Sequence, residues 1–335
     1  METKLRDLYP VSDYTNPIGI ELEVEFLEAA PIIETKNWRS KREGSLRYYG
    51  AEFVNPSPIC LSKKRTLIEG LLKTIRKVPL IEDSPRTSIH VHVNVLDYTP
   101  VQVWTAACAY WILENLLFKY CGKEREGNLF CLRLCDAQGV IDYILHDLTL
   151  SSKTDRPFTS FRGDAVRYAG LNINAVPKFG SLEFRGMRGA VDATIMDTWS
   201  TEMYNIINNA ATKYKDPEDL MDTFFKSDKK DFMKTLLSSD FVDLLISLDK
   251  TWKDLVDSNT GIVMGIAYFH DWSTWGNTVD KIRQKRTDRT STKASVLAAE
   301  LAMVQRVNRT IRAVENPPVQ QVIPDEWMQL DNGDF

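Results

Sequence analysis

The sequence predicts an α+β fold, with an antiparallel sheet in the first half of the chain and helices in the second. Several segments before residue 190 alternate apolar and polar side chains with the period of two that a half-buried strand requires. From Asp192 onward the apolar residues instead recur at helical spacing. Strands that come first and helices that come later indicate an α+β arrangement with an antiparallel sheet.

The strands are predicted from this alternation. Residues 19–26 alternate strictly, so their aliphatic side chains face one way and three glutamates, Glu21, Glu23 and Glu25, face the other. Further strands are expected at 47–56, 88–98, 167–176 and 181–187, and a short turn at 177–180 joins the last two.

Helices are expected over residues 62–78 and 100–120, packed on the convex, apolar side of the sheet. Thr99 followed by Pro100 is typical of a helix start, because Thr is a favoured N-cap and Pro is favoured at the first helical position. Later helices are expected from 192, across 216–258 and over 292–315. The chain thus divides into a sheet region, residues 1–190, and a helical region, residues 191–335, that completes the same domain or forms a subdomain.

Composition excludes several classes of protein. The chain has 335 residues, 43% hydrophobic and 26% charged, which is typical of an ordinary globular chain. A net charge of -4 argues against a broad nucleic-acid-binding surface. No segment approaches the ~18 unbroken apolar residues of a membrane helix, and residues 1–17 lack the apolar stretch of a secretory signal. We therefore expect a cytoplasmic protein.

The five cysteines form no CxxC pair, so we expect reduced thiols. Cys121, Cys131 and Cys135 offer zinc ligands, but their spacing matches no usual zinc pattern, and buried or incidental thiols are the simpler interpretation.

The acidic side of the first strand is the first candidate site. A row such as Glu21, Glu23 and Glu25 is usually a solvated face. This row, however, carries one sign of charge, and two carboxylates ~4 Å apart repel by about 4 kcal/mol at an effective dielectric constant of 20. A folded sheet that gathers such groups usually supplies a cation.

Two of the four histidines form the second candidate. His90 and His92 are two residues apart on a predicted strand, so both imidazoles face the same side. A pair of hydrogen-bonded histidines is the alternative to a metal site, and the concentration of half of the histidines in one tripeptide favours function.

Glu183 and Arg185 share one face of the last predicted strand and form the third candidate. Taken alone they predict a salt bridge. Arg188 follows closely, and Arg167 and Lys178 flank the preceding strand. A carboxylate for a metal beside guanidinium groups for phosphate is the combination that an ATP site requires. The sequence contains no P-loop, no GxGxxG after a strand and no GxSxG nucleophile elbow.

Taken in order, five motifs resemble the amidoligase family, distant relatives of glutamine synthetase and glutamate–cysteine ligase. They lie between Gly19 and Gly189, and they read GIELEVE, EGSLRYYGAEFVNPSP, SIHVHVNV, ENLLFKYCGKEREGN and RYAGLNINAVPKFGSLEFRGMRG. The resemblance implies a curved antiparallel sheet of the glutamine synthetase catalytic type, whose concave face holds ATP and Mg²⁺ or Mn²⁺ ions.

The resemblance also implies roles for individual residues. Metal ligands would be Glu21, Glu23, Glu52, His90 and Glu183. Catalytic roles would fall to Glu183, Arg185 and His92, of which His92 lies nearer the phosphates. Nucleotide contacts would come from Arg185, Arg188, Lys178 and Arg125; Glu114 and Arg125 match a looser helix-and-loop motif. The chain departs from the family in having Glu43 where Asp is common before Gly-Ser, and Thr87-Ser88-Ile89 where Cys-Gly is common before the HxH motif.

The implied reaction is formation of an amide or isopeptide bond from a carboxylate and an amine, with ATP first converting the carboxylate into an acyl phosphate. Substrates would be small molecules or peptides, and the sequence identifies neither them nor the oligomeric state. Glu25 and Glu43 are both candidates for the base that deprotonates the amine. Bacterial, fungal and phage genomes carry such proteins, so the expected cytoplasmic location includes the host cytoplasm, where a phage-encoded enzyme would act.

Two other classes of function stay open. A cupin-type hydrolase or oxygenase also uses an HxH motif and a glutamate with a third histidine, for which His146 and His270 are candidates. A non-catalytic binding protein on a ligase fold is the other alternative. The basic segment 281–293 is interpreted as a solvated loop, and the aromatic cluster at 268–272 as part of a core.

Overall fold

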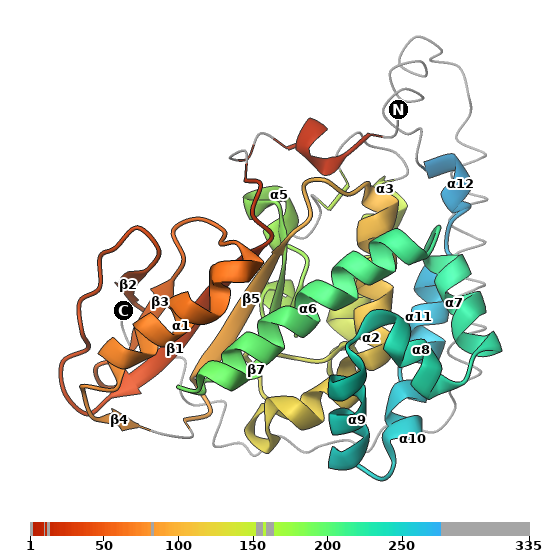
Figure 1. Cartoon of the computed structure of the whole chain (residues 1–335). Coiled ribbons are helices and arrows are strands. Elements are labelled where there is room, and N and C mark those ends of the chain that lie inside the picture. Colours follow the sequence, from red (N-terminus) through yellow and green to blue (C-terminus); the bar gives the residue numbers. More distant parts are fainter. Residues whose placement is uncertain are drawn as a thin grey trace.

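A computed structural model describes residues 3–9, 11, 14–81, 84–151, 157–158 and 164–275 of the chain. The predicted helix at 292–315 and the basic segment at 281–293 lie outside these residues. Within them the fold is α+β, as the sequence predicts, with an open, entirely antiparallel sheet covered by helices (Figure 1).

Seven strands form the sheet in the order β2-β3-β1-β5-β7-β6, and β4 pairs with the far end of β1. Their bounds are β1 Ile18–Phe26, β2 Arg39–Arg42, β3 Ala51–Val54, β4 Leu80–Ile81, β5 Ser88–Asn94, β6 Leu171–Asn172 and β7 Ser181–Arg188. The predicted strands at 19–26 and 181–187 are confirmed, the strand predicted at 88–98 is confirmed only as far as Asn94, and β1, β5 and β7 lie side by side at the centre of the sheet.

Two other predicted strands are much shorter than expected. The strand expected at 47–56 shrinks to β3, because Tyr48 adopts a positive φ of 54° and the residues around it form turns. The strand expected at 167–176 shrinks to β6, because the Asn172 side chain accepts a hydrogen bond from the Asn174 N–H and turns the chain away. The turn expected at 177–180 is the end of a short helix, α5, Ala175–Phe179, closed by Gly180 at φ 71°.

Helices α1, Leu61–Ile75, and α2, Pro100–Cys121, match the two helices predicted in the first half. The Thr99 hydroxyl accepts a hydrogen bond from the Gln102 N–H, and the Gln102 side chain accepts one from the Thr99 N–H, which confirms the predicted helix start. The remaining described α-helices are α3 Gln138–Ser151, α4 Asp164–Arg167, α6 Ala193–Lys213, α7 Pro217–Lys226, α8 Lys229–Leu236, α9 Ser239–Leu248, α10 Trp252–Asp257, α11 Thr260–Ala267 and α12 Trp272–Trp275.

The apolar face of the sheet is covered by α1 and α6, which run across it in Figure 1. Trp199 and Met203 of α6 are fully buried, and α6 contacts β5 and β1. The prediction that the helix at 100–120 packs on this face holds only in part: α2 contacts β7 and lies mainly against α6. The reason is composition, because α2 is apolar all round and becomes the centre of the helical layer, with α7, α9, α10 and α11 packed on it.

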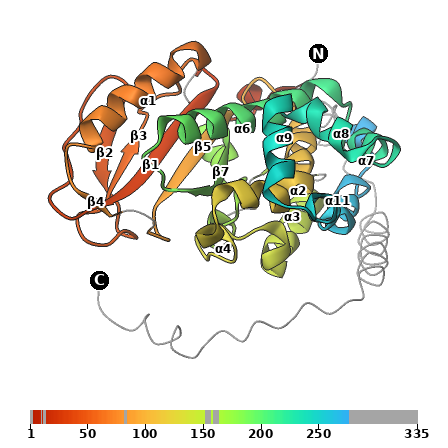
Figure 2. The same cartoon turned by 60° about the horizontal axis from the view of Figure 1, so that its bottom comes forward.

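Among the described residues, none of the helices is both long and apolar enough to cross a membrane. The five cysteines are free, as predicted, and three of them, Cys108, Cys121 and Cys131, are buried. In Figure 2, α1 and α6 lie above the sheet and α4 lies below β7, on the other side.

Candidate functional site

The register of the sheet brings the predicted site residues together in rows. Glu21 of β1 lies opposite His90 of β5, and His92 of β5 lies opposite Glu183 of β7. Glu23 lies opposite Glu52 of β3. Because directly opposite residues of antiparallel strands face the same side, all of these polar side chains share the face opposite α1 and α6.

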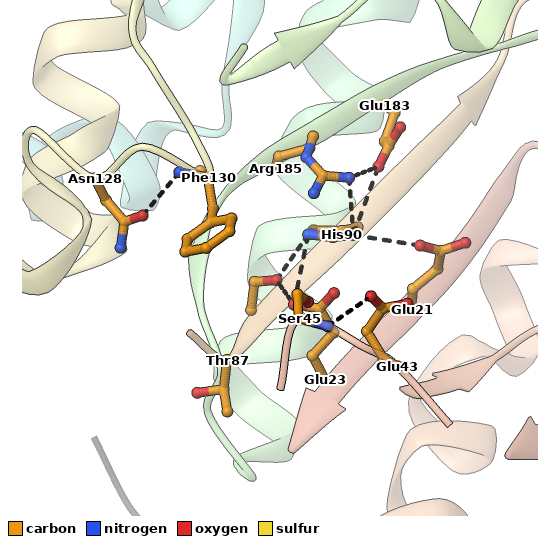
Figure 3. Close-up of polar contacts among 12 residues, drawn as sticks. Glu21, Glu23, Glu43, Ser45, Thr87, His90, Asn128, Phe130, Glu183 and Arg185 are labelled. Carbon is orange, nitrogen blue, oxygen red and sulfur yellow. Dashed lines mark hydrogen bonds and ion pairs between the residues drawn. The ribbon is translucent and has the colours of Figure 1, made fainter. Parts of the chain in front are cut away.

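Three of them converge on one point. The Nδ1 atom of His90 lies 3.3 Å from Oε2 of Glu21 and 3.5 Å from Oε1 of Glu183. One ligand atom from each residue lies within 4.8 Å of the others, which is compact enough for one metal ion to be bound by all three. His90 and Glu183 are buried and Glu21 is half-buried. Figure 3 shows the three side chains pointing toward one another.

Arg185 closes this cluster on its β7 side. Its Nη1 atom donates to Oε1 of Glu183 at 2.5 Å and lies 3.4 Å from Nδ1 of His90. The other oxygen of Glu183 accepts a hydrogen bond of 2.6 Å from the Asn172 side chain. Both oxygens of Glu183 are thereby held in place, and the guanidinium group lies directly beside the candidate metal ligands (Figure 3).

Glu23 and Glu52 line the next row. Glu23 accepts a hydrogen bond from the Ser88 hydroxyl, and its Oε2 atom lies 3.9 Å from Nε2 of His90. Glu52 lies 3.8 Å from the Lys41 amine, not beside His90. Burial and the neighbouring Glu21 raise the pKa of Glu52 to about 8.

Burial and the neighbouring charges act in opposite directions on the pKa values of the cluster. Burial alone would raise the pKa of Glu21, but His92 and His90 lower it well below its usual value. Burial likewise opposes ionisation of Glu183, and His92 and Arg185 lower its pKa. In His92 the effect is reciprocal: burial would lower its pKa, whereas Glu21 and Glu183 raise it. These carboxylates stay ionised because cationic groups surround them.

A polar pocket of about 840 Å³ opens over this cluster. Its lining includes five acids, Glu21, Glu23, Glu43, Glu52 and Glu183, and it also includes the cations Arg86, Arg167 and Lys178 and the aromatic residues Phe130, Tyr168 and Phe179. This volume lies in the range of roughly 300–1,000 Å³ that is typical of small-molecule sites. The pocket thus has acids on its floor and cations on its rim.

Of the two candidate bases, Glu43 lines this pocket, where its carboxylate accepts a hydrogen bond from the Ser45 N–H. Glu25 is buried, and its Oε1 atom accepts a hydrogen bond of 2.6 Å from the Arg47 N–H. Glu25 therefore holds the turn before β3 in place, and it does not line the pocket.

Arg125, Arg188 and Glu114 lie elsewhere than their expected roles require. Arg125 is fully buried and does not line the pocket, and four of the five N–H groups of its guanidinium donate to the carbonyl oxygens of Gly186, Arg185, Pro85 and Thr87. It supports the backbone of β7 beneath Arg185. Arg188 donates to the Tyr120 carbonyl oxygen and does not line the pocket. Glu114 is buried in α2 and accepts a hydrogen bond from the Leu134 N–H.

Sequence reasoning missed three residues of the site. Ser88 precedes His90 by two positions, so strand parity places it on the same face. Asn172 carries no such signal, because the strand around it is only two residues long. Arg86 enters from a loop, where it donates to the Ser45 carbonyl oxygen and lines the pocket, and no periodicity marks it.

No family model matches this chain, and a comparison with curated proteins finds no match.

Proposed function

We propose that this chain is an ATP-dependent ligase that joins a carboxylate to an amine. The observation that carries the proposal is the convergence of Glu21, His90 and Glu183 beside Arg185 on the floor of a large polar pocket. A structural salt bridge between Glu183 and Arg185 would need neither the imidazole nor a second carboxylate from another strand. The resemblance to amidoligases supplies the reaction that fits this arrangement.

The residues present fit a divalent cation. Glu21, Glu23, Glu52 and Glu183 offer the oxygen ligands that Mg²⁺ prefers, and the imidazole of His90 suits Mn²⁺ at least as well. Glu21, His90 and Glu183 would hold the ion. When bound, it would neutralise phosphate oxygens and so allow two anionic reactants to approach each other.

The protein's own groups have distinct tasks in such a reaction. The substrate carboxylate attacks the γ-phosphoryl group of ATP, ADP leaves, the amine then attacks the acyl phosphate, and phosphate leaves. Arg185 lies where its forked guanidinium would stabilise the charge of the transferred phosphoryl group. Arg86, Arg167 and Lys178 on the rim would orient the nucleotide, and Glu43 is the acid in the pocket best placed to take the proton of the amine.

The cupin-type alternative requires a third histidine near the HxH strand. His270 contacts the Leu148 carbonyl oxygen and His146 lies on α3, and neither lines the polar pocket. The described residues therefore offer one imidazole and two carboxylates at the point of convergence, which favours phosphate chemistry over a cupin-type site.

The experiment is metal-dependent ADP formation from ATP in the presence of mixed carboxylates and amines. Glu183→Gln preserves the shape of the side chain and removes the charge of a metal ligand. Arg185→Lys replaces the planar guanidinium, which can donate two parallel hydrogen bonds, with a compact ammonium group. Both variants should abolish ADP formation. Glu69→Gln and Arg65→Lys, on the exposed surface of α1, are matched controls and should behave as wild type. A non-catalytic binding protein would bind ATP without ever releasing ADP. Equal rates in wild type and both site variants would remove these residues from the mechanism.

A further inference from the structure

A second pocket of about 330 Å³ lies at the other end of the same strands. It shares only three lining residues with the polar pocket, namely Glu21, His92 and Phe179. The two cavities therefore meet at the candidate metal cluster and approach it from opposite ends of the sheet. A ligase has to bring two substrates to one reacting centre, and two cavities that meet there provide for this.

The walls of the smaller pocket are apolar and fixed in place. Val54, Pro56 and Pro58 line one side. Two asparagines beside them use their amides internally: Asn55 accepts from the Ile20 N–H and donates to the Asn37 carbonyl oxygen, and Asn94 donates to the Tyr14 carbonyl oxygen. These amide groups are occupied in holding the strand ends together, so the pocket presents a preorganised hydrocarbon surface to a ligand.

The two ends of the pocket carry opposite charges. Arg39 of β2 lies opposite Val54 of β3, and Val54 lies opposite Glu21 of β1, so all three share one row of the sheet. Strands lie roughly 4.8 Å apart, which separates the backbones of Arg39 and Glu21 by about 10 Å with an apolar side chain between them. A complementary ligand has a cationic end at Glu21, an anionic end at Arg39 and an apolar middle.

We propose that this smaller pocket binds the amine substrate, and that this substrate is an amino carboxylate whose two charged groups are separated by several apolar atoms, such as an ω-amino acid or a short peptide. This assignment rests on the ligase function proposed above. The amine would lie at Glu21, where the two pockets meet and the acyl group formed in the polar pocket reaches it. The carboxylate would bind Arg39, with Lys41 of the same strand nearby.

A competing carboxylate already lies next to Arg39. Its Nε atom lies 2.7 Å from Oε1 of Glu34, and more than half of each side chain is exposed. Exposed pairs of this kind contribute little to stability, so a ligand carboxylate can displace Glu34 easily. Removing Arg39 and removing Glu34 should therefore change ligand affinity in opposite directions.

The test uses 6-aminohexanoate as the probe, titrated calorimetrically into the full chain without metal or nucleotide. Affinity should fall about tenfold in Arg39→Gln, should rise in Glu34→Gln and should be unchanged in the α1 control Arg65→Gln. Hexylamine and hexanoate, which each lack one charged group, should bind more weakly than the probe.

Three results would overturn the assignment: no binding of 6-aminohexanoate, equal affinity in wild type and Arg39→Gln, or hexanoate binding as tightly as the probe. Mn²⁺ and ATP binding are measured separately on the same samples. If they are intact while the probe fails, the substrate assignment is wrong and the ligase proposal stands. If Mn²⁺ and ATP fail to bind while the probe responds to Arg39 and Glu34 as expected, the pocket binds amino carboxylates and the ligase proposal fails.

Discussion

The two faces of strand β1 are both largely buried, yet burial is achieved by different means. On one face Ile20, Leu22 and Val24 pack into the core beneath α1 and α6. On the other face Glu23 and Glu25 are almost equally inaccessible. The apolar face is stabilised by its transfer out of water, whereas the acidic face needs a specific partner for every oxygen.

Those partners are unevenly supplied. Glu25 accepts a backbone N–H, and Glu23 accepts the Ser88 hydroxyl. Glu21 and Glu183 share the imidazoles and Arg185. Five acids line the polar pocket, and apart from His90 and His92 only Arg185 and Lys41 contact them in ion pairs among the described residues. A fold selected for stability alone has no reason to gather these groups, so the acidic face points to function.

The largest effect that separates the two faces is expected from Leu22→Ala. Leu22 is fully buried, so truncation should lower the free energy of unfolding by about 2–5 kcal/mol. The variant Glu21→Gln, at the adjacent residue on the acidic face, removes a charge but no volume. It should destabilise the fold far less than Leu22→Ala. Denaturant unfolding of both variants measures the difference; equal losses would mean that the acidic face is a structural core like the other.

Glu114 can be compared with the acids of the candidate site, because it is a buried acid that lies outside that site. Its Oε1 atom has no hydrogen-bond partner among the described residues, and burial raises its pKa to about 8 from 4.5. Between about pH 5 and pH 8 the folded state holds a proton that the unfolded chain has released. Its contribution to stability is therefore complete below pH 4.5 and falls by about 1.4 kcal/mol per pH unit as the pH rises toward 8.

Glu114→Gln should abolish this fall. The stability of the variant relative to wild type should increase steadily from pH 5 to pH 8 in thermal unfolding experiments. A constant difference over that range would show that Glu114 is ionised in the folded protein and has a partner.

The smallest effect is expected at the rim of the second pocket. Because the Arg39–Glu34 pair is exposed, Arg39→Gln should change the free energy of unfolding by less than about 1 kcal/mol. The melting temperature of this variant provides the check. A large drop would mean that Arg39 supports the edge of the sheet, and any loss of ligand affinity would then have to be attributed to structure.

Strand periodicity predicted the central part of the fold and of the site. The period of two fixes which face Glu21, Glu23, His90, His92 and Glu183 occupy, and antiparallel pairing brings them together. Strand β2 was not predicted, because Arg39–Arg42 reads RSKR and an edge strand needs no apolar alternation.

The positions of the arginines could not be predicted from the sequence. Arg125 and Arg185 both lie in motifs from which nucleotide contacts were predicted, yet one guanidinium is buried among backbone carbonyl oxygens and the other faces the pocket. Only the path of the loop before Arg125 decides this, and loops carry no periodic signal. Asn172 likewise acquires its role from a tertiary contact with Glu183.

The most direct test of the central claim is a titration of the protein with Mn²⁺, followed by electron paramagnetic resonance. Wild type and Glu69→Gln should bind the ion. Glu183→Gln should bind it roughly 100-fold more weakly, which is the upper end of the loss in affinity caused by removing a residue that only orients a metal ligand. Its melting temperature should be unchanged. If wild type does not bind Mn²⁺, or if Glu183→Gln binds it equally well, Glu21, His90 and Glu183 are not a metal site.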